Sequence, residues 1–241
     1  GLPQISAAIV QLAEPSSLSE EPSSLAEEPS SLLTEPSSLL NEATNAVKQA
    51  FLNGACIVAI PSMLADLKSD AADSELRKAA QQSTAIIGAL ASVCDQQWVV
   101  TAAVMPCETG YQFCSVVVGS EGVVLKQAQL HHSERFAWSQ PCNEIKTLRL
   151  PFGRIGLAAS DDSIYPEYFR LLALAGVEVA VVPLQPLEAW ELRTGLIERA
   201  AENRINLLVA AQSAIVNPAL GASFSAALQT DSTIMTEWTE R

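Results

Sequence analysis

Along most of this 241-residue chain, apolar segments of strand length alternate with amphipathic segments of helix length. The predicted strands cover residues 5–11, 55–61, 98–105, 111–118, 122–126, 146–150, 154–160, 178–183 and 205–211, with two short strands near the end. The predicted helices cover residues 41–53, 73–95, 166–175 and 187–203, and a polar loop is predicted at residues 127–145. Such alternation with interposed hairpins is typical of an α/β fold, in which helices lie outside mixed sheets.

Residues 14–41 are four tandem heptapeptides, EPSSLSE, EPSSLAE, EPSSLLT and EPSSLLN. Each unit contains a proline, which excludes one continuous helix and leaves short helices beginning at each proline. The segment has six acidic and no basic residues. We interpret it as an exposed acidic insertion in a single domain that spans residues 1–241. The alternative is a docking arm that presents the leucine of each unit to a partner, namely Leu18, Leu25, Leu32 and Leu39.

Charge and cysteine content bear on partners and location. A net charge of −13 argues against nucleic acid and anionic membranes as partners. No apolar run approaches the roughly 18–20 residues of a membrane span, and residues 1–4 do not resemble the start of a signal peptide. The five cysteines form no CxxC pair, which favours reduced thiols and a cytoplasmic location. His131 and His132 are predicted to lie exposed in a loop, and we expect no metal and no cofactor.

The junction between a predicted strand and a predicted helix carries the most informative motif. Residues 156–167 read GLAASDDSIYPE, so Ser160 ends the strand and Asp161 and Asp162 follow it. This segment resembles the nucleophile turn of the nitrilase, or carbon-nitrogen hydrolase, superfamily. In that turn, small apolar residues precede Cys-Tyr-Asp, two variable residues, an aromatic residue, Pro and Glu. Ser160 therefore stands at the cysteine position and Asp162 at the aspartate position.

Further segments resemble the same superfamily, in the same order, along nearly the whole chain. They are ISAAIVQ at 5–11, GACIVAIPS at 54–62, VLKQAQL at 124–130, GVEVAVVP at 176–183, Trp190, and RAAEN at 199–203. The resemblance implies a nitrilase-like α-β-β-α sandwich of two mixed sheets flanked by helices. It also implies pairing through the outer helices into a dimer. Many family members continue into a C-terminal tail that helps dimers form, and this chain ends at Arg241, so we expect it to be short.

The family's reaction uses a Glu, a Lys and a Cys, which serve as base, cation and nucleophile. Carried over position by position, the Glu becomes Ser62, the Lys becomes Gln127 and the Cys becomes Ser160. A serine in place of the base accepts no proton at neutral pH, and glutamine offers no charge. Lys126 is one residue away, which places its side chain on the opposite face of a strand.

We interpret the chain as a pseudoenzyme, which has an interaction, regulatory or ligand-binding role and does not catalyse a reaction. It would pair with itself or with a partner protein, or bind a small amide-like ligand. One alternative is an active amidase or nitrilase with a relocated nucleophile, for which Cys107 and Cys114 are candidates and Asp161 or Asp162 would be the base. A second alternative is a structural subunit tethered by the repeats. Asp162 is expected to bond backbone donors at its turn, and Phe136, Trp138, Tyr165 and Tyr168 are candidate pocket residues.

Overall fold

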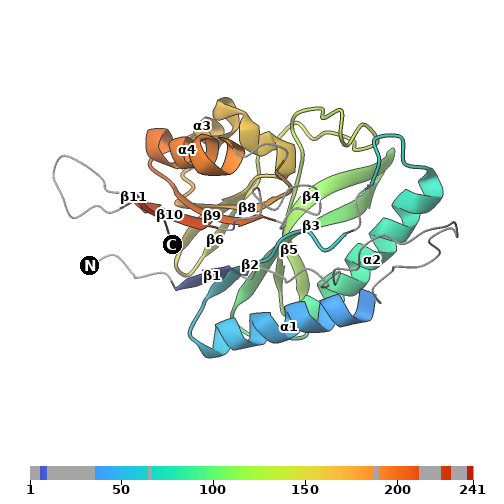
Figure 1. Cartoon of the computed structure of the whole chain (residues 1–241), viewed down its shortest axis with the longest axis horizontal. Helices are drawn as coiled ribbons and strands as arrows, with labels where there is room; N and C mark the ends of the chain where they lie inside the picture. Colours follow the sequence, from blue (N-terminus) through green and yellow to red (C-terminus); the bar gives the residue numbers. More distant parts are fainter. Residues whose placement is uncertain are drawn as a thin grey trace, which may run out of the picture.

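A computed structural model describes residues 6–9, 36–64, 67–186, 190–211, 224–228 and 238–240. Its first sheet has five strands in sequence order, β1 (Ala7–Ile9), β2 (Ile57–Ala59), β3 (Trp98–Cys107), β4 (Gly110–Gly119) and β5 (Gly122–Ala128). The β1, β2 and β3 strands are parallel, whereas β3, β4 and β5 form an antiparallel meander. The helices α1 (Pro36–Leu52) and α2 (Asp73–Ala91) cover the outer face of this sheet (Figure 1).

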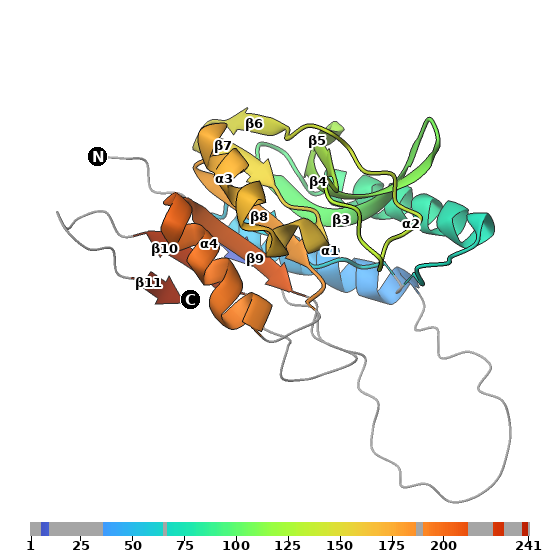
Figure 2. The same ribbon diagram turned by 90° about the horizontal axis from the view of Figure 1, so that it is seen from above.

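The second sheet follows the order β11-β10-β9-β8-β7-β6. Its strands are β6 (Thr147–Leu150), β7 (Gly153–Leu157), β8 (Val179–Leu184), β9 (Asn206–Ala211), β10 (Phe224–Leu228) and β11 (Trp238–Glu240). The central strands β7, β8 and β9 are parallel, which requires helical crossovers. These crossovers contain α3 (Pro166–Leu174) and α4 (Leu196–Asn203), and both helices lie on the outer face of the sheet (Figure 2).

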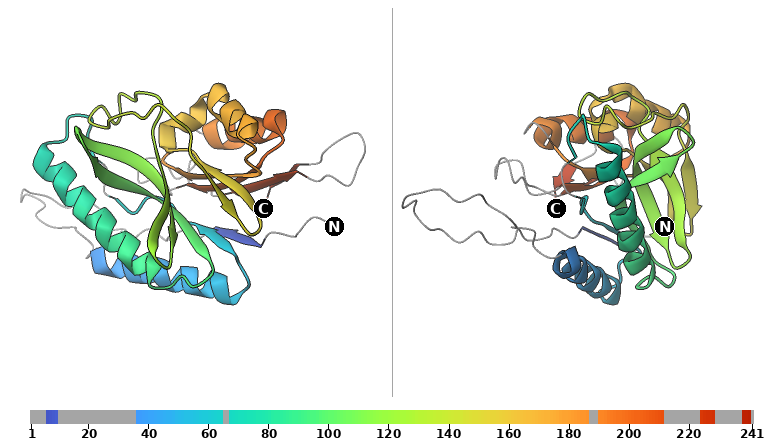
Figure 3. Two further views of the ribbon diagram at one scale, coloured as in Figure 1. Left: turned by 180° about the vertical axis from the view of Figure 1, so that it is seen from behind. Right: turned by 90° about the vertical axis from the view of Figure 1, so that its right-hand side faces the viewer.

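The two sheets pack face to face between the two pairs of helices, which gives four layers (Figure 3). Strand alternation explains the packing, because every second residue of a strand points to the same face. In β3 and β4, for example, Val100 and Val117 point between the sheets, whereas Val99 and Val116 point toward α1 and α2. The predicted α-β-β-α sandwich of two mixed sheets is therefore confirmed.

Several predicted boundaries shift in ways that affect the site. The β5 strand continues to Ala128, so Gln127 is a strand residue and the polar loop begins after it. The β7 strand ends at Leu157, and Ser160 begins a short 3-10 helix, Ser160–Ile164, instead of ending a strand. The predicted helix at 187–203 consists of a π-helical turn, Glu191–Gly195, followed by α4.

The first helix begins at Pro36, inside the fourth heptapeptide, and not at residue 41 as predicted. Proline is favoured at the first helical position, where its missing N–H costs no hydrogen bond and its φ angle already suits a helix. Leu40 of this unit packs against the core beneath α1, so the fourth unit belongs to the folded domain. The helix ends before Gly54, whose φ of 91° suits a glycine stop. The first three heptapeptides lie outside the described residues.

Candidate functional site

Gln127, at the position of the family's lysine, lies near the end of β5 and is 1% exposed. Its amide nitrogen donates hydrogen bonds to the carbonyl oxygens of Ala128 and Glu144, at 2.8 and 3.1 Å. Its amide oxygen accepts a hydrogen bond from the backbone N–H of Lys146 at 2.7 Å. The side chain thus fastens the segment that precedes β6 to the end of β5, and both of its polar atoms are engaged.

The register of the first sheet connects Gln127 to the segment that leads to Ser160. Gln127 pairs with Ser115 on β4, and the Ser115 hydroxyl donates a hydrogen bond to the carbonyl oxygen of Ala158 at 2.8 Å. Lys126 instead pairs with Val116, which faces the α1 and α2 layer, and its ammonium group donates to Gln112 Oε1 at 3.1 Å. The Lys126 side chain therefore takes the opposite face from Gln127, as predicted.

Ser160, at the nucleophile position, is fully buried and has a φ of 43°. This left-handed conformation is uncommon for a residue with a side chain and costs on the order of 1–3 kcal/mol when tertiary structure imposes it. The Ser160 hydroxyl donates to Asp161 Oδ1 at 3.3 Å. The turn therefore keeps a strained backbone at the position where the family has its nucleophile, while the side chain is an alcohol.

The Asp161 carboxylate, beside Ser160, is held by two further donors. Arg135 Nη1 lies 3.3 Å from Asp161 Oδ1, and the Ser133 hydroxyl donates to Oδ2. The same guanidinium donates to the backbone oxygen of Gln185 at 2.8 Å and stacks over the ring of Phe136. A carboxylate and a cation thus do meet beside Ser160, but they bind each other.

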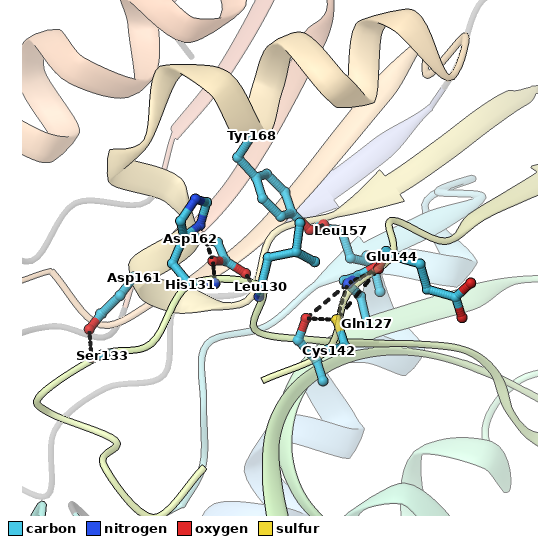
Figure 4. A network of polar contacts seen from close by, with 11 residues as sticks. Gln127, Leu130, His131, Ser133, Cys142, Glu144, Leu157, Asp161, Asp162 and Tyr168 are labelled. Carbon is cyan, nitrogen blue, oxygen red and sulfur yellow. Dashed lines mark hydrogen bonds and ion pairs between the residues drawn. The ribbon is translucent and has the colours of Figure 1, made fainter. Parts of the chain in front are cut away.

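Asp162 is fully buried and joins the turn to the loop that follows β5. Its carboxylate accepts hydrogen bonds from the backbone N–H groups of Leu130 and His131, at 2.8 and 2.9 Å, and His131 Nδ1 lies 2.8 Å away (Figure 4). Burial raises the pKa of Asp162, and the bonds from His131 and Leu130 oppose that rise. The expected backbone donors exist, but they come from the loop across from Asp162 and not from its own turn.

The two histidines occupy different environments, which corrects the prediction of an exposed pair. His132 is exposed. His131 stacks on the ring of Tyr165, with centroids 3.8 Å apart, and it contacts the buried Asp162 carboxylate. Close by, the Tyr168 hydroxyl donates to the carbonyl oxygen of Leu157 at 2.6 Å, and burial raises the pKa of Tyr168 well above its usual value.

Ser62, at the position of the family's glutamate, is 2% exposed and follows β2. Its hydroxyl accepts a hydrogen bond from the backbone N–H of Leu64 at 3.3 Å. The preceding residue, Pro61, accepts a hydrogen bond from the Thr101 hydroxyl on β3 at 3.2 Å. Ser62 is therefore buried in a tight turn beyond β2 and has no ionisable group.

Cys142 is a site residue that the sequence did not indicate. Its thiol sulfur lies 3.3 Å from Gln127 Nε2, and the thiol donates to the carbonyl oxygens of Ala128 and Glu144, at 3.2 and 3.4 Å (Figure 4). Burial is the main cause that raises the pKa of Cys142. The residue lies in the loop between matched segments, so no motif pointed to it, and only the bonds of Gln127 place it at the site.

The two cysteines considered as relocated nucleophiles lie on the first sheet. Cys114 is fully buried on β4, and burial raises its pKa to about 12. Cys107 ends β3, where its sulfur lies 3.9 Å from the Thr109 hydroxyl. At neutral pH the Cys114 thiol is therefore protonated and a weak nucleophile.

The matched residues near the C-terminal end form local contacts. Arg199 binds the Glu202 carboxylate at 2.5 Å, and Asn203 donates to the carbonyl oxygen of Arg199 at 3.0 Å, so these bonds lie within α4. Trp190 is 50% exposed and its ring lies against Gly195, where a side chain would meet it at 2.9 Å. Trp190 is thus a surface residue and not part of the core.

Within the part of the chain that the structure describes, no three His, Cys, Asp or Glu side chains gather as metal ligands would. The helices in those same ranges are too short or too polar to cross a membrane.

The fold and the turn at Ser160 define a protein of the nitrilase type, and comparison with known proteins agrees. The family model for carbon-nitrogen hydrolases matches residues 6–238, so this chain belongs to the carbon-nitrogen hydrolase family. No curated protein sequence matches it.

Among solved structures, the chain is similar to an amidase from Nesterenkonia sp., with a TM-score of 0.66 and 20% identity over 80% of this chain and 77% of the amidase. A mutant of that amidase from Nesterenkonia sp. AN1, with acrylamide added to the active-site cysteine, matches with a TM-score of 0.64 and 20% identity, over 80% of each chain. Another mutant, in complex with butyramide, has a TM-score of 0.65 and 20% identity over 80% of this chain and 78% of that chain.

Proposed function

We propose that this chain is a catalytically silent carbon-nitrogen hydrolase, a pseudoenzyme that acts by binding or regulation. The observation that supports this most is the set of hydrogen bonds that the Gln127 side chain makes. At the position where the family places a cation, a neutral amide uses both of its polar atoms to hold the backbone of the 144–146 segment. Such an amide offers no charge to a developing oxyanion, and its donors are already occupied.

The other two positions support the same proposal. Ser62 has no ionisable group, and the Ser160 alcohol is a far weaker acid than a thiol. The adjacent carboxylate, Asp161, is already engaged by Arg135 and the Ser133 hydroxyl. Because base, cation and nucleophile act as a unit, replacing all three costs about as much activity as losing one essential member, on the order of a million-fold.

The test is release of ammonia from butyramide and acrylamide, the amides named for the solved neighbours. We expect none above background from the unmodified protein, and little from Ser160→Cys alone. The triple variant Ser62→Glu, Gln127→Lys, Ser160→Cys should gain measurable hydrolysis if the pocket keeps the family geometry. A triple variant with Ser163→Cys in place of Ser160→Cys is the matched control. An acyl adduct on Ser160 of the unmodified protein would overturn the proposal.

An active hydrolase with a relocated nucleophile is the second candidate, and the position of Cys142 favours it. Its thiol lies 3.3 Å from an amide donor at the lysine position. Against this, burial raises the pKa of Cys142, so little of the reactive thiolate forms at neutral pH. Mass spectrometry after incubation with butyramide separates the two functions, because a butyryl adduct on a thiol forms only when the amide nitrogen leaves as ammonia. Time-dependent acylation at Cys142, together with hydrolysis that Cys142→Ala abolishes and Cys107→Ala retains, would establish this candidate.

A regulatory or binding role requires a partner, and self-association is part of the proposal. The outer face of α3 exposes Leu171 and Leu174, at 46% and 69%, which suits pairing through the outer helices with a second copy or a related chain. Leu174→Glu should reduce the molar mass measured by light scattering to that of a monomer. Leu52→Glu, which changes an equally apolar and exposed residue on α1, should leave the mass unchanged. Identical masses for both variants and the unmodified protein would count against this interface.

A cytoplasmic location is part of the proposal and is supported by the five cysteines, all of which are free.

A tethering role for the heptapeptides remains the alternative to an exposed insertion. Removing residues 14–34 and measuring retention of the partner protein decides between them, because only a tether requires these residues for assembly.

A further inference from the structure

The side chains of Cys142 and Gln127 lie side by side at the end of β5 (Figure 4). The Cys142 sulfur is 3.3 Å from Gln127 Nε2. The thiol and the amide nitrogen also share two acceptors, because each lies within hydrogen-bonding distance of the carbonyl oxygens of Ala128 and Glu144. A nucleophilic atom of one side chain is thus held beside the amide group of the other.

The amide carbon of Gln127 is within reach of this sulfur. A nucleophile attacks Cδ, which is one C–N bond of about 1.33 Å from Nε2, so the sulfur is at most about 4.6 Å from Cδ. The sulfur accepts a hydrogen bond from Nε2 and therefore lies on the nitrogen side of the amide. Rotation about χ1 of Cys142 brings it toward Cδ, and attack requires a separation of about 3–3.5 Å.

The surroundings of the Gln127 amide favour such an attack. Its oxygen accepts a hydrogen bond from the backbone N–H of Lys146 at 2.7 Å, and this fixed donor stabilises the negative charge that develops on the oxygen. Gln127 is 1% exposed, so the carbonyl group is shielded from water that would hydrolyse an acyl intermediate. Cys142 is only partly buried, which leaves an approach to the sulfur from solvent.

We propose that Cys142 and Gln127 form an internal thioester that acylates primary amines. In the first step the sulfur bonds to Gln127 Cδ, the Cδ–Nε2 bond breaks, and the thiol proton leaves on the nitrogen as ammonia. In the second step a primary amine bonds to the same carbon, the carbon–sulfur bond breaks, and an amine proton passes to the sulfur. The product is a substituted amide on the Gln127 side chain and a free Cys142 thiol.

Proximity and mass action drive the first step. Reacting groups held together in a fold reach effective molarities of about 10⁵–10⁸ M, and the released ammonia is diluted into solvent. The inference goes beyond a catalytically silent hydrolase, because it gives the chain a covalent way to bind an amine, such as a lysine of a partner protein. Neither residue stands at the family's nucleophile position, and the amide that reacts belongs to the chain itself.

The charges around Cys142 set the expected pH dependence. Burial raises the pKa of the thiol, the Asp162 carboxylate adds to that rise, and the Lys146 ammonium opposes it. Tyr168 and Cys114 are the other titratable groups that interact with Cys142, and burial raises the pKa of each. Since the thiolate is the attacking species, the thioester should form about tenfold faster for each unit of pH below the pKa of Cys142.

Intact mass spectrometry of the full chain, denatured in acid after incubation at about pH 9, tests the inference. We expect a form that is lighter by one ammonia, and in this form the thiols titrated under denaturing conditions should fall from five to four. Methylamine should then add once to the lighter form, restore the fifth thiol and appear on Gln127 in the peptide map. A lighter form that keeps five thiols, as an asparagine succinimide would, overturns the inference.

Cys107→Ala is the matched control for Cys142→Ala, because Cys107 is also a partly buried cysteine but lies at the end of β3. Cys142→Ala should abolish the lighter form, and Cys107→Ala should retain it. Gln127→Glu, which keeps the size and one oxygen of the side chain but has no amide nitrogen to lose, should also abolish it. Absence of the lighter form from the unmodified protein, or its presence in Cys142→Ala, would overturn the inference.

Discussion

The end of β5 and the turn after β7 are joined by hydrogen bonds, yet the first has a neutral side chain at its family position and the second has a carboxylate. At the end of β5, a neutral glutamine occupies the place of a lysine and binds only backbone groups of one loop. At the turn, the aspartate of the family motif is present as Asp162, and it binds the backbone of another loop although burial raises its pKa. The comparison separates two positions: the motif aspartate, whose hydrogen bonds join two segments of the fold, is present, whereas a neutral amide stands at the position of the family's lysine.

The largest effect is expected at Asp162. Asp162→Ala leaves the N–H groups of Leu130 and His131 without their acceptor and should lower the free energy of unfolding by about 2–6 kcal/mol, at roughly 1–3 kcal/mol for each of the two donors. Denaturation in urea measures this change. Asp161→Ala is the control, because the Asp161 side chain is 18% exposed whereas that of Asp162 is fully buried. Equal losses in the two variants would remove the structural role assigned to Asp162.

A smaller effect is expected at Gln127. Gln127→Leu leaves the N–H of Lys146 unpaired and removes one of the two donors to the Glu144 carbonyl oxygen, and we expect a loss of about 1–3 kcal/mol. Gln127→Lys should cost at least as much, since it buries a cation without a carboxylate at Ser62 to balance it. Lys126→Gln, on the opposite face of β5, should change stability by no more than about 0.5 kcal/mol. If Gln127→Lys were as stable as the unmodified protein, the Gln127 amide would not be needed to hold the 144–146 segment.

The third prediction concerns pH. Because burial raises the pKa of Asp162 above its ordinary 3.8, the folded state takes up a proton more readily than the unfolded state. This group therefore adds stability at low pH, and the contribution is lost as pH rises through the raised pKa. As pH rises above 3.8, Asp162→Asn should lack this dependence, whereas Asp161→Asn should keep it. Melting curves recorded at several pH values test this, and parallel profiles for the unmodified protein and Asp162→Asn would contradict it.

The fold was largely predictable because its signals are local. Strand-length apolar runs and amphipathic helices specify α/β alternation, and the order of the matched segments supplied the stacking of the two sheets. The start of α1 was missed because proline was taken as a barrier within the repeats. At Pro36 it instead occupies the first helical position, where it is favoured.

The site was less predictable because its contacts are long-range. The sequence marks Ser62, Gln127 and Ser160, but it does not show that Gln127 binds the 144–146 segment or that Cys142 lies beside it. His131 is a second example. Because it adjoins His132 in a polar loop, the sequence predicted a surface residue, whereas the structure places it against Asp162. Partners that lie 15 to 31 residues apart leave no periodic pattern in one sequence.

The smallest effects are expected in the heptapeptides, where two leucines at the same position of successive units can be compared. Leu40 is the sixth residue of the fourth unit and packs beneath α1, so Leu40→Ala should cost about 1 kcal/mol, less than a fully buried leucine. Leu33 is the sixth residue of the third unit, which the sequence predicts to be exposed. Leu33→Ala should therefore stay within about 0.5 kcal/mol. Thermal melts of both variants test whether the packed part of the heptapeptide segment begins at Pro36. Equal losses would mean that the repeat is packed beyond its last unit.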